Sequence, residues 1–531
     1  MKKIFLFLII SLFSIPAMYA VVTWDGTSSE MWTQGTGTEA DPYLIETPAN
    51  LAYLSAQVTA GKTYAGVHFQ QTEDFDLQSK TWRPIGTTTY KFAGIYNGAN
   101  KYVSNIKTSQ YGLFGITENT KIVNLSIQGT YSSSNASVSA PLIGTVQGET
   151  EVINCHNHAV VNNACAGLIV SATGNSISLY NCSNHANINS TAYSAGGLIA
   201  SVNTNTLTLE SCYNEGLLTF YNKSSFNETE GSYKIASLYC GGLIGKVSGT
   251  CISTLKYCYN AGDISAAVDV FKLGEIGGTR VLLYAGGLVG HNASSNKGLV
   301  MQCYHIATIS TSTRATGTTK YLAKNVAGLV NGNYDIIGCF VRTNTNMSSG
   351  SSTDSYGVQT TWVGNLLGGK VSESCYAIGT GNLPAQSSNV FHNSSNITGG
   401  IYKSDVMFKS PTMISLLNTL GDYFTMDLEG INDGYPILKW QAGPHFTITG
   451  SCDANRGTVK GGGEYAPGNT ATLTAIPKKG CTFVGWSDGN TDNPRTIIVN
   501  GDATYTAEFE QIQYTVEALP DNPTQGSTIV E

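Results

Sequence analysis

Charged residues are scarce in this chain of 531 residues, because Asp, Glu, Lys and Arg together make up 12%, about half the usual share in a soluble domain. A charge-driven disordered chain is excluded, since 41% hydrophobic residues are enough to form cores. A coiled coil is excluded by composition, and collagen is excluded because the 59 glycines have no three-residue period. The net charge of −7 gives no support for a nucleic-acid partner or an anionic membrane.

Long apolar runs are also missing, apart from one at the start of the chain. Lys2 and Lys3 precede an apolar run over 4–15, and Ala20 ends a stretch typical of a secretory signal peptide over 1–20. This run is too short for a comfortable membrane span, and no later run approaches the necessary length. The sequence therefore predicts a secreted or cell-surface protein with no transmembrane segment in the mature chain.

Two short patterns recur in alternation through most of the chain. One is a small residue followed by Gly, Leu and an apolar residue, and the other is Cys, an aromatic or polar residue and Asn. Successive copies of the first lie 26 to 45 residues apart, which indicates stacked copies of one supersecondary unit. The first pattern contains Leu113, Leu142, Leu168, Leu198, Leu243, Leu288, Leu329 and Leu366. The second begins at Cys155, Cys182, Cys212 and Cys258, and decayed copies without the Asn begin at Cys303, Cys339 and Cys375.

The repeated unit is predicted to be a coil of short strands. Runs such as 177–180 and 207–210 alternate apolar and polar residues, and no run between the patterns has helical spacing. These features favour an all-β fold, a right-handed parallel β-helix, in which each coil packs on the next. We expect the Gly-Gly pairs to allow a tight bend with positive φ, and the Asn residues to stack as a hydrogen-bonded ladder. The longest steps are expected to carry protruding, aromatic-rich insertions over 217–239 and 264–284.

Seven of the twelve cysteines occupy one repeat position, so they are expected to form one inward-facing column. Cys is small and is often buried as a thiol. An exported protein also allows disulfides, so at least one bridge between coils remains an alternative.

The remaining segments divide the chain into domains. A short helix is expected after Thr47, with Pro48 at its first position, and a second over 411–420. From Phe446 onward, short alternating strands predict a small β-rich module, and a second copy begins before the sequence stops at Glu531. The predicted organisation is a signal peptide over 1–20, an N-terminal cap and first coils over 21–110, the repeat β-helix over 111–400, a C-terminal cap over 401–443, the module over 444–512 and a truncated second module over 513–531.

These patterns resemble a known type of bacterial protein. The Gly-Leu and Cys-Tyr-Asn patterns are similar to GLUG-motif repeats of surface proteins, and 24–26, 82–86 and 432–440 look like the usual flanks of such repeats in Bacteroidetes. Residues 446–510 resemble the internalin B-repeat (Listeria–Bacteroides repeat) module, which is β-grasp-like. The resemblance implies an adhesin-like protein that is secreted or on the cell surface. In this module Cys481 replaces the usual aromatic residue, and a disulfide with Cys452 is one possibility that the resemblance leaves open.

Catalytic chemistry has little support in the sequence. Some relatives of GLUG proteins carry a metallopeptidase domain, but this chain has no His-Glu-x-x-His motif. Carboxylates are sparse over 121–400, whereas the hydrolases and lyases with this fold class need them clustered. His158, His185 and Glu215 each follow a turn Asn, so they should stack on adjacent coils and could bind Zn²⁺. The simpler interpretation, which we prefer, is a variable exposed position of the turn.

The sequence thus predicts a non-enzymatic, adhesin-like scaffold without catalytic, cofactor-binding or metal-binding residues. Its expected partner is an extracellular protein or glycan, and not a nucleic acid. The alternatives are a carbohydrate-active β-helix enzyme and the non-catalytic part of a larger secreted protease or hydrolase. Because the second module is incomplete, further domains are expected beyond Glu531.

Overall fold

The computed structural model describes residues 21–227, 235–273, 280–316, 321–342, 363–364, 375–378, 402–443, 446–465 and 470–513. The chain forms two compact units, Met1–Phe408 with Ser415–Tyr423, and Lys409–Ile414 with Phe424–Glu531. The predicted signal peptide, Leu366 and most of the truncated second module lie outside the described residues. No helix in the described part is both long enough and apolar enough to cross a bilayer.

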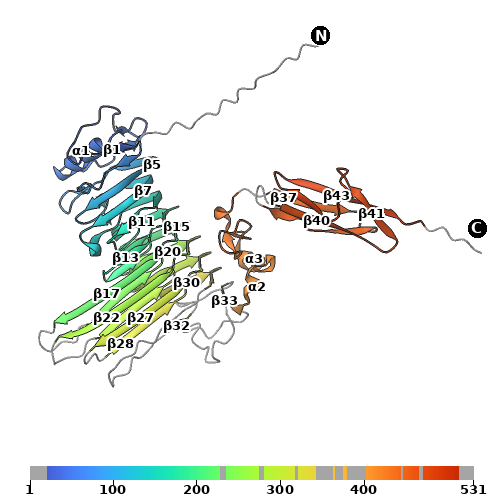
Figure 1. Ribbon diagram of the computed structural model, residues 1–531. Helices are drawn as coiled ribbons and strands as arrows, with labels where there is room; N and C mark the ends of the chain where they lie inside the picture. Colours follow the sequence, from blue (N-terminus) through green and yellow to red (C-terminus); the bar gives the residue numbers. More distant parts are fainter. Residues whose placement is uncertain are drawn as a thin grey trace, which may run out of the picture. The chain divides into compact units, whose positions relative to one another are not determined.

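The first unit is a parallel β-helix, as predicted (Figure 1). In its largest sheet each strand pairs in parallel with the equivalent strand of the neighbouring coil, for example Leu179 of β11 with Leu209 of β15. The sheet has 25 strands: β1 (Val22–Thr23), β2 (Tyr43–Ile45), β3 (His68–Gln71), β4 (Phe75–Asp76), β5 (Ile95–Thr108), β6 (Phe114–Glu118), β7 (Lys121–Ser133), β8 (Ile143–Gln147), β9 (Glu149–Asn157), β10 (Val160–Asn162), β11 (Ile169–Tyr180), β12 (Ser183–Asn184), β15 (Ile199–Glu210), β16 (Tyr213–Asn214), β19 (Ile244–Val247), β20 (Ile252–Lys256), β21 (Tyr259–Asn260), β24 (Val289–Asn292), β25 (Gly298–Met301), β26 (Tyr304–His305), β29 (Val330–Gly332), β30 (Tyr334–Ile337), β31 (Phe340–Val341), β33 (Tyr376–Ile378) and β34 (Tyr402–Lys403).

Two smaller parallel sheets complete the later coils, and the described residues of the predicted insertions belong to them. The insertion residues extend these sheets: β17 pairs with β22 over ten residues, from Leu218 and Ile264 onward, and β18 pairs with β23. One sheet contains β13 (Ile188–Ser190), β17 (Leu218–Asn227), β22 (Ile264–Leu273) and β27 (Ile309–Thr316), and the other contains β14 (Ser194–Gly196), β18 (Ile235–Gly241), β23 (Arg280–Gly286), β28 (Tyr321–Ala327) and β32 (Val363–Gly364).

The cysteine column is confirmed. The seven repeat cysteines are buried, and Leu125 precedes them in the same register as Cys155. All twelve cysteines of the chain are free thiols. The Sγ atom of Cys182 lies 3.3 Å from the carbonyl oxygen of Val152 in the preceding coil, and burial raises the pKa of this thiol well above its usual value. These residues therefore fill the core, and the alternative of disulfides between coils is not what the structure has.

The explanation predicted for the Gly-Gly pairs is wrong. Gly197 and Gly242 do not have positive φ, and both are needed because the backbones of successive coils approach closely. A Cβ atom on Gly197 would lie 2.0 Å from the carbonyl oxygen of Gly242, and one on Gly242 would lie 2.0 Å from that of Gly287. Positive φ occurs instead at the residue before six of the seven repeat cysteines: Asn154 (53°), Asn181 (49°), Ser211 (53°), Tyr257 (55°), Gln302 (53°) and Gly338 (59°).

Both predicted helices are present. Helix α1 (Pro48–Thr59) is capped by Thr47, whose Oγ1 accepts a hydrogen bond of 3.2 Å from the backbone amide of Asn50, and its buried face packs on the first coils. The second predicted helix corresponds to α3 (Pro411–Leu417) and a 3₁₀ turn, η3 (Asn418–Leu420). Helix α2 (Asp405–Phe408) comes before it, and 3₁₀ turns η1 (Ala136–Val138) and η4 (Lys439–Gln441) are also described.

Residues after the last coil return along the side of earlier coils. The ring of Phe408 lies 5.7 Å from that of Phe340, and the ring of Tyr423 stacks at 5.0 Å on that of Tyr257. These contacts cover part of the turn edge of the first unit.

The C-terminal module has its own small core, which contains Ile448, Leu473, Trp486, Val499 and Phe509. Cys452 and Cys481 lie at its margin as free thiols, so the disulfide suggested by the resemblance is not formed. One sheet contains β39 (Gly463–Tyr465), β37 (Phe446–Cys452), β43 (Ala503–Gln511) and β41 (Cys481–Trp486), another contains β38 (Gly457–Lys460), β40 (Thr470–Pro477) and β42 (Arg495–Ile498), and a separate hairpin pairs β35 (Phe424–Thr425) with β36 (Ile437–Leu438).

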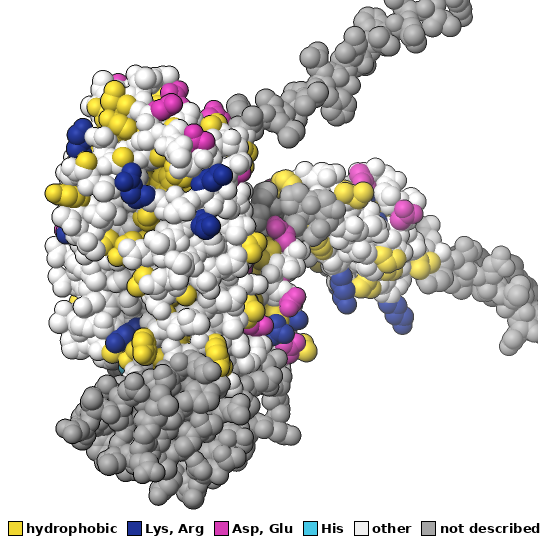
Figure 2. All heavy atoms as spheres, turned by 60° about the vertical axis from the view of Figure 1, so that its left-hand side comes forward, with side chains coloured by type: hydrophobic (Ala, Val, Ile, Leu, Met, Phe, Trp, Pro, Cys, Tyr) yellow, Lys and Arg dark blue, Asp and Glu magenta, His cyan; other side chains and the backbone are white. Residues whose placement is uncertain are grey.

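The surface of the coils reflects the low charge of the sequence. Figure 2 shows one face on which most of the described surface is backbone or side chains that are neither charged nor hydrophobic, and on which several Lys and Arg side chains lie in the upper part, over the N-terminal coils. A face of this composition offers many hydroxyl and amide groups and few fixed charges.

Candidate functional site

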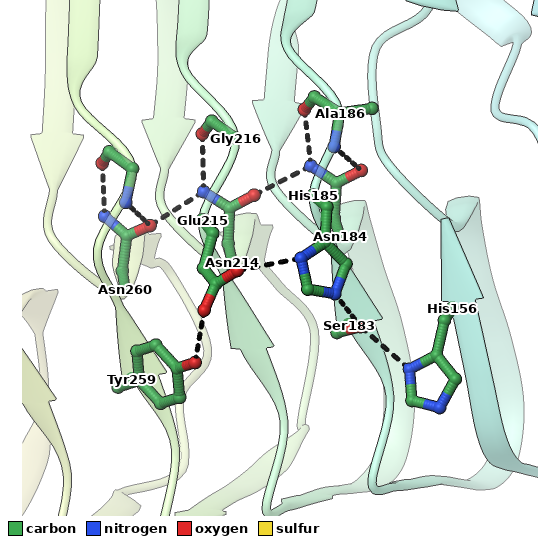
Figure 3. Close-up of polar contacts among 11 residues, drawn as sticks. His156, Ser183, Asn184, His185, Ala186, Asn214, Glu215, Gly216, Tyr259 and Asn260 are labelled. Carbon is green, nitrogen blue, oxygen red and sulfur yellow. Dashed lines mark hydrogen bonds and ion pairs between the residues drawn. The ribbon is translucent and has the colours of Figure 1, made fainter. Parts of the chain in front are cut away.

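The turn edge of the coils contains the predicted asparagine ladder (Figure 3). Asn157, Asn184, Asn214 and Asn260 occupy equivalent positions in successive coils and are fully buried. Each Nδ2 donates to the Oδ1 of the next Asn, at 2.8, 2.8 and 2.7 Å. The ladder ends at His305, whose Nδ1 lies 3.1 Å from Asn260 Nδ2. All the donors point toward the C-terminal end, so the ladder has a direction.

A second polar row lies beside this ladder and joins four coils. Ser183 Oγ lies 2.8 Å from His156 Nδ1 and 2.9 Å from His185 Nε2. His185 Nδ1 lies 2.7 Å from Glu215 Oε2, and the Tyr259 hydroxyl donates to Glu215 Oε1 at 2.7 Å. The row is visible in Figure 3 as a chain of contacts running across the strands.

The structure brings together the three residues considered as a zinc site, but not as metal ligands. The rings of His158 and His185 stack at 4.2 Å, and Glu215 lies against His185. Both ring nitrogens of His185 already have partners. Burial and the neighbouring His185 lower the pKa of His158, while the hydrogen bond from His185 lowers the pKa of Glu215. Within the described ranges, no three His, Cys, Asp or Glu side chains are arranged to hold a metal ion.

The same row has the order of a Ser-His-acid triad, which the sequence did not suggest. A nucleophile must be accessible to its substrate, and Ser183 is 0% exposed. Its hydroxyl lies between two imidazoles from different coils, so its role is to connect coils. Burial also lowers the pKa of His156 to about 4, which keeps this row neutral at its N-terminal end near pH 7.

An aromatic stack follows the middle residue of the Cys-Tyr-Asn pattern. The rings of Tyr213, Tyr259, Tyr304 and Phe340 lie parallel, with centroids 4.8, 4.9 and 4.9 Å apart. Only Tyr213 is partly exposed. The stack therefore contributes to packing between coils and leaves little aromatic surface for a ligand.

Most of the described aromatic residues of the insertions are likewise buried or stacked on other rings. Phe220 is buried, and the Tyr239 ring stacks at 5.4 Å on that of Tyr284, which stacks at 4.1 Å on His291. Tyr221 is 41% exposed. The side chains of Phe226 and Tyr233 lie outside the described residues.

Two adjoining hollows lie elsewhere, on the N-terminal coils. The first has a volume of about 310 Å³, a floor that includes Trp24 and Trp82, and a rim that includes Thr27, Ser29 and Arg83. The two indole rings pack edge to face at 5.5 Å. The second hollow, of about 360 Å³, is lined by Thr81, Lys107, Thr108, Ser109 and residues 132–134.

Thr81 lines both hollows, and neither is lined by a carboxylate or a histidine. The sequence analysis did not identify them, because their walls come from the turn at 24–29, helix α1, the extended segment 81–83 and two later strands. The sequence signals at this place are the segments 24–26 and 82–86, which indicate a resemblance to the flanks of GLUG repeats and not a binding site.

Comparisons with known proteins found one family model, one curated relative and one solved structure that are similar to parts of this chain. Residues 447–513 match the family model of the divergent InlB B-repeat domain. A protein from Evansella cellulosilytica, provisionally named a Gly-rich membrane protein, is 30% identical over 164 residues, which cover 29% of this chain and 17% of that protein. The chain thus spans only a small part of the length of this curated relative.

One solved structure was also similar, a crystal structure provisionally described as an immunoglobulin A1 protease from Bacteroides ovatus. The TM-score is 0.40 at 14% identity, and the match covers 77% of this chain and 95% of that one. The family match confirms the predicted B-repeat resemblance of the C-terminal module. The GLUG-type assignment of the coils stays a prediction.

Proposed function

We propose that this chain is a non-enzymatic binding scaffold of the adhesin type, secreted or held at the cell surface. The observation that carries the proposal is the character of the N-terminal hollows. They are lined by hydroxyl groups, two exposed cations and buried tryptophans, with no carboxylate or histidine to act as acid or base. This lining favours binding over acid–base chemistry by a carboxylate or a histidine.

Three further observations support the extracellular part of the proposal. The sequence begins with a predicted signal peptide over 1–20. The Evansella relative is named a membrane protein, and the C-terminal module matches InlB B-repeats. The polar row at Ser183 and His185 supports the absence of catalysis, since its one hydroxyl nucleophile is buried.

The test is a binding screen of the purified chain from Val21 to Glu531 against a glycan array and a panel of extracellular matrix proteins. We expect reproducible binding to at least one glycan or protein class, with no change in the bound material. If nothing binds, the adhesin proposal is wrong and a spacer role remains. If the bound glycan is shortened, measured as new reducing ends or unsaturated products, the chain is a carbohydrate-active enzyme instead.

A further inference from the structure

We propose that the two adjoining hollows form one groove that binds an acidic polysaccharide, with Arg83 and Lys107 each contacting a carboxylate of the same glycan chain. This inference rests on the proposed function and specifies its ligand and its site. The groove is defined as the surface lined by Trp24, 26–29, 81–83, 107–109 and 132–134, with Thr81 at its centre.

The backbone that carries Arg83 is held firmly, while its side chain is exposed. Ser55 of helix α1 donates its hydroxyl to the carbonyl oxygens of Arg83, at 2.8 Å, and Pro84, at 3.3 Å. Trp82 donates its backbone amide to the carbonyl oxygen of Lys107 at 2.7 Å and its indole Nε1 to that of Leu113 at 3.0 Å. Because its backbone is already fixed, the exposed arginine loses less entropy when it binds a ligand.

The two cations belong to adjacent coils. Thr81 is the bridge partner of Lys107, so their backbones lie about 4.8 Å apart, and Arg83 is two residues further along the extended chain. Both cationic side chains are exposed, and neither makes an ion pair with a described residue. A ligand lying across the coils can therefore present one acidic group to Arg83 and another to Lys107.

The charge around the groove favours an anion, although the whole chain has a net charge of −7. From 77 to 117 the sequence contains five Lys or Arg residues, of which Lys91 is paired with Glu118, and no Asp or Glu. Two carboxylates on the neighbouring turns keep their negative charge, but they are hydrogen-bonded to amides of the protein. Asp25 accepts the amides of Thr27 and Ser28, both at 2.7 Å, and Asp76 accepts an amide of its own turn and a side-chain amide.

The shape and polar groups favour a sugar over another anion. The rim offers exposed hydroxyls from Thr27, Ser29, Thr81 and Ser109, which can both donate to and accept from sugar hydroxyls. Guanidinium matches the planar, two-oxygen geometry of a carboxylate. Two hollows in line, each near the lower end of the ~300–1,000 Å³ of ligand pockets, suit successive residues of a chain. These features together point to a polyuronate or a similar carboxylated glycan.

The test uses the purified chain from Val21 to Glu531 and polygalacturonate oligosaccharides, with affinity measured by titration calorimetry. Arg83→Gln and Lys107→Gln should each weaken binding roughly fivefold, and the double variant roughly 25-fold, because the two contacts are independent. Lys256→Gln removes the same charge from a later coil and should bind as the wild type does. Circular dichroism should be unchanged in all variants, since the side chains removed are solvent-accessible.

Several outcomes would overturn the groove assignment. These are no binding of polygalacturonate by the wild-type chain, equal loss in Lys256→Gln, or full binding by the double variant. Dextran sulfate or inorganic phosphate competing as well as the uronate would overturn the carboxylate assignment. If the double variant keeps all the ligands found in the array screen, this inference fails while the proposed binding scaffold stands. If the array contains no ligand that binds the chain, both this inference and the proposed binding scaffold are wrong.

Discussion

Replacing Asn214 by Ala tests how much the asparagine ladder contributes to the stability of the coils. Asn214 is fully buried. Its Oδ1 accepts from Asn184 Nδ2 at 2.8 Å, and its Nδ2 donates to Asn260 Oδ1 at 2.7 Å and to the carbonyl oxygen of Gly216 at 2.9 Å. The substitution therefore removes two hydrogen bonds between coils and one within a turn.

The expected loss follows from these three bonds. At about 1 kcal/mol for each, Asn214→Ala should lower the free energy of unfolding by about 3 kcal/mol. The neighbours are not left entirely unpaired, because Asn184 Nδ2 keeps Ala186 and Asn260 Oδ1 keeps the amide of Gly262. Asn214→Asp should cost more at neutral pH, since the oxygen that replaces Nδ2 would face two acceptors, Asn260 Oδ1 and the Gly216 carbonyl oxygen.

The measurement is urea unfolding followed by far-ultraviolet circular dichroism, with hydrogen exchange of the amides over 213–217. The matched control is Asn189→Ala on β13, whose side chain is exposed, and it should change the free energy by at most about 0.5 kcal/mol. The reasoning is refuted if Asn214→Ala is as stable as that control. It is also refuted if the turn amides of Asn214→Ala exchange no faster than those of the wild type.

Three further predictions follow from the coils and the module. Burial lowers the pKa of His305 to about 4, below the ~6.5 of an unfolded chain. The contribution of neutral His305 to stability is therefore complete above pH ~6.5 and is lost as the pH falls toward 4. The His305→Asn variant should bind about one proton fewer on acid unfolding, and an unchanged pH profile of the unfolding midpoint would contradict this. Gly197→Ala should destabilise the first unit by several kcal/mol because its Cβ would lie 2.0 Å from a carbonyl oxygen. The matched variant is Gly66→Ala, at a position with open space but positive φ, and it should cost about 1 kcal/mol in the same urea titration. Cys452 and Cys481 are partly exposed and the other ten cysteines are buried, so a bulky thiol reagent should rapidly modify only these two in the native chain. The assignment of two accessible thiols is refuted if mass spectrometry finds neither of them modified, or finds other cysteines modified equally fast.

The repeated parts of the fold could be predicted because one residue type recurs at one position. The cysteine column and the asparagine ladder are visible in the sequence for this reason, and so is the parallel β-helix itself. The position with positive φ has no such signal, since Asn154, Ser211 and Tyr257 all occupy it. Glycine is compatible with either positive φ or close approach, so the Gly-Gly pairs alone could not distinguish the two.

The stacking of His185 and Glu215 on adjacent coils could be predicted from their equivalent positions, but the residues that join them into a row could not. Ser183 contacts His185 two residues along its own coil and His156 on the preceding coil. The groove is formed by segments as far apart as 24–29 and 132–134. No local pattern reports such a combination, and the exposed hydroxyls that line it are common everywhere in the chain.

The direction of the asparagine ladder has a consequence for how such a protein can change its length in evolution. Each internal Asn presents an acceptor to the coil before it and a donor to the coil after it. A duplicated coil from this region therefore fits between its parents with every side-chain bond restored, and a deleted one lets its neighbours rejoin. A coil that carries His305 does not continue the ladder in this way, because His305 Nδ1 faces Asn260 while its buried Nε2 has no hydrogen-bond partner among the described residues. Growth and shrinkage by whole coils are thus expected on the N-terminal side of this histidine.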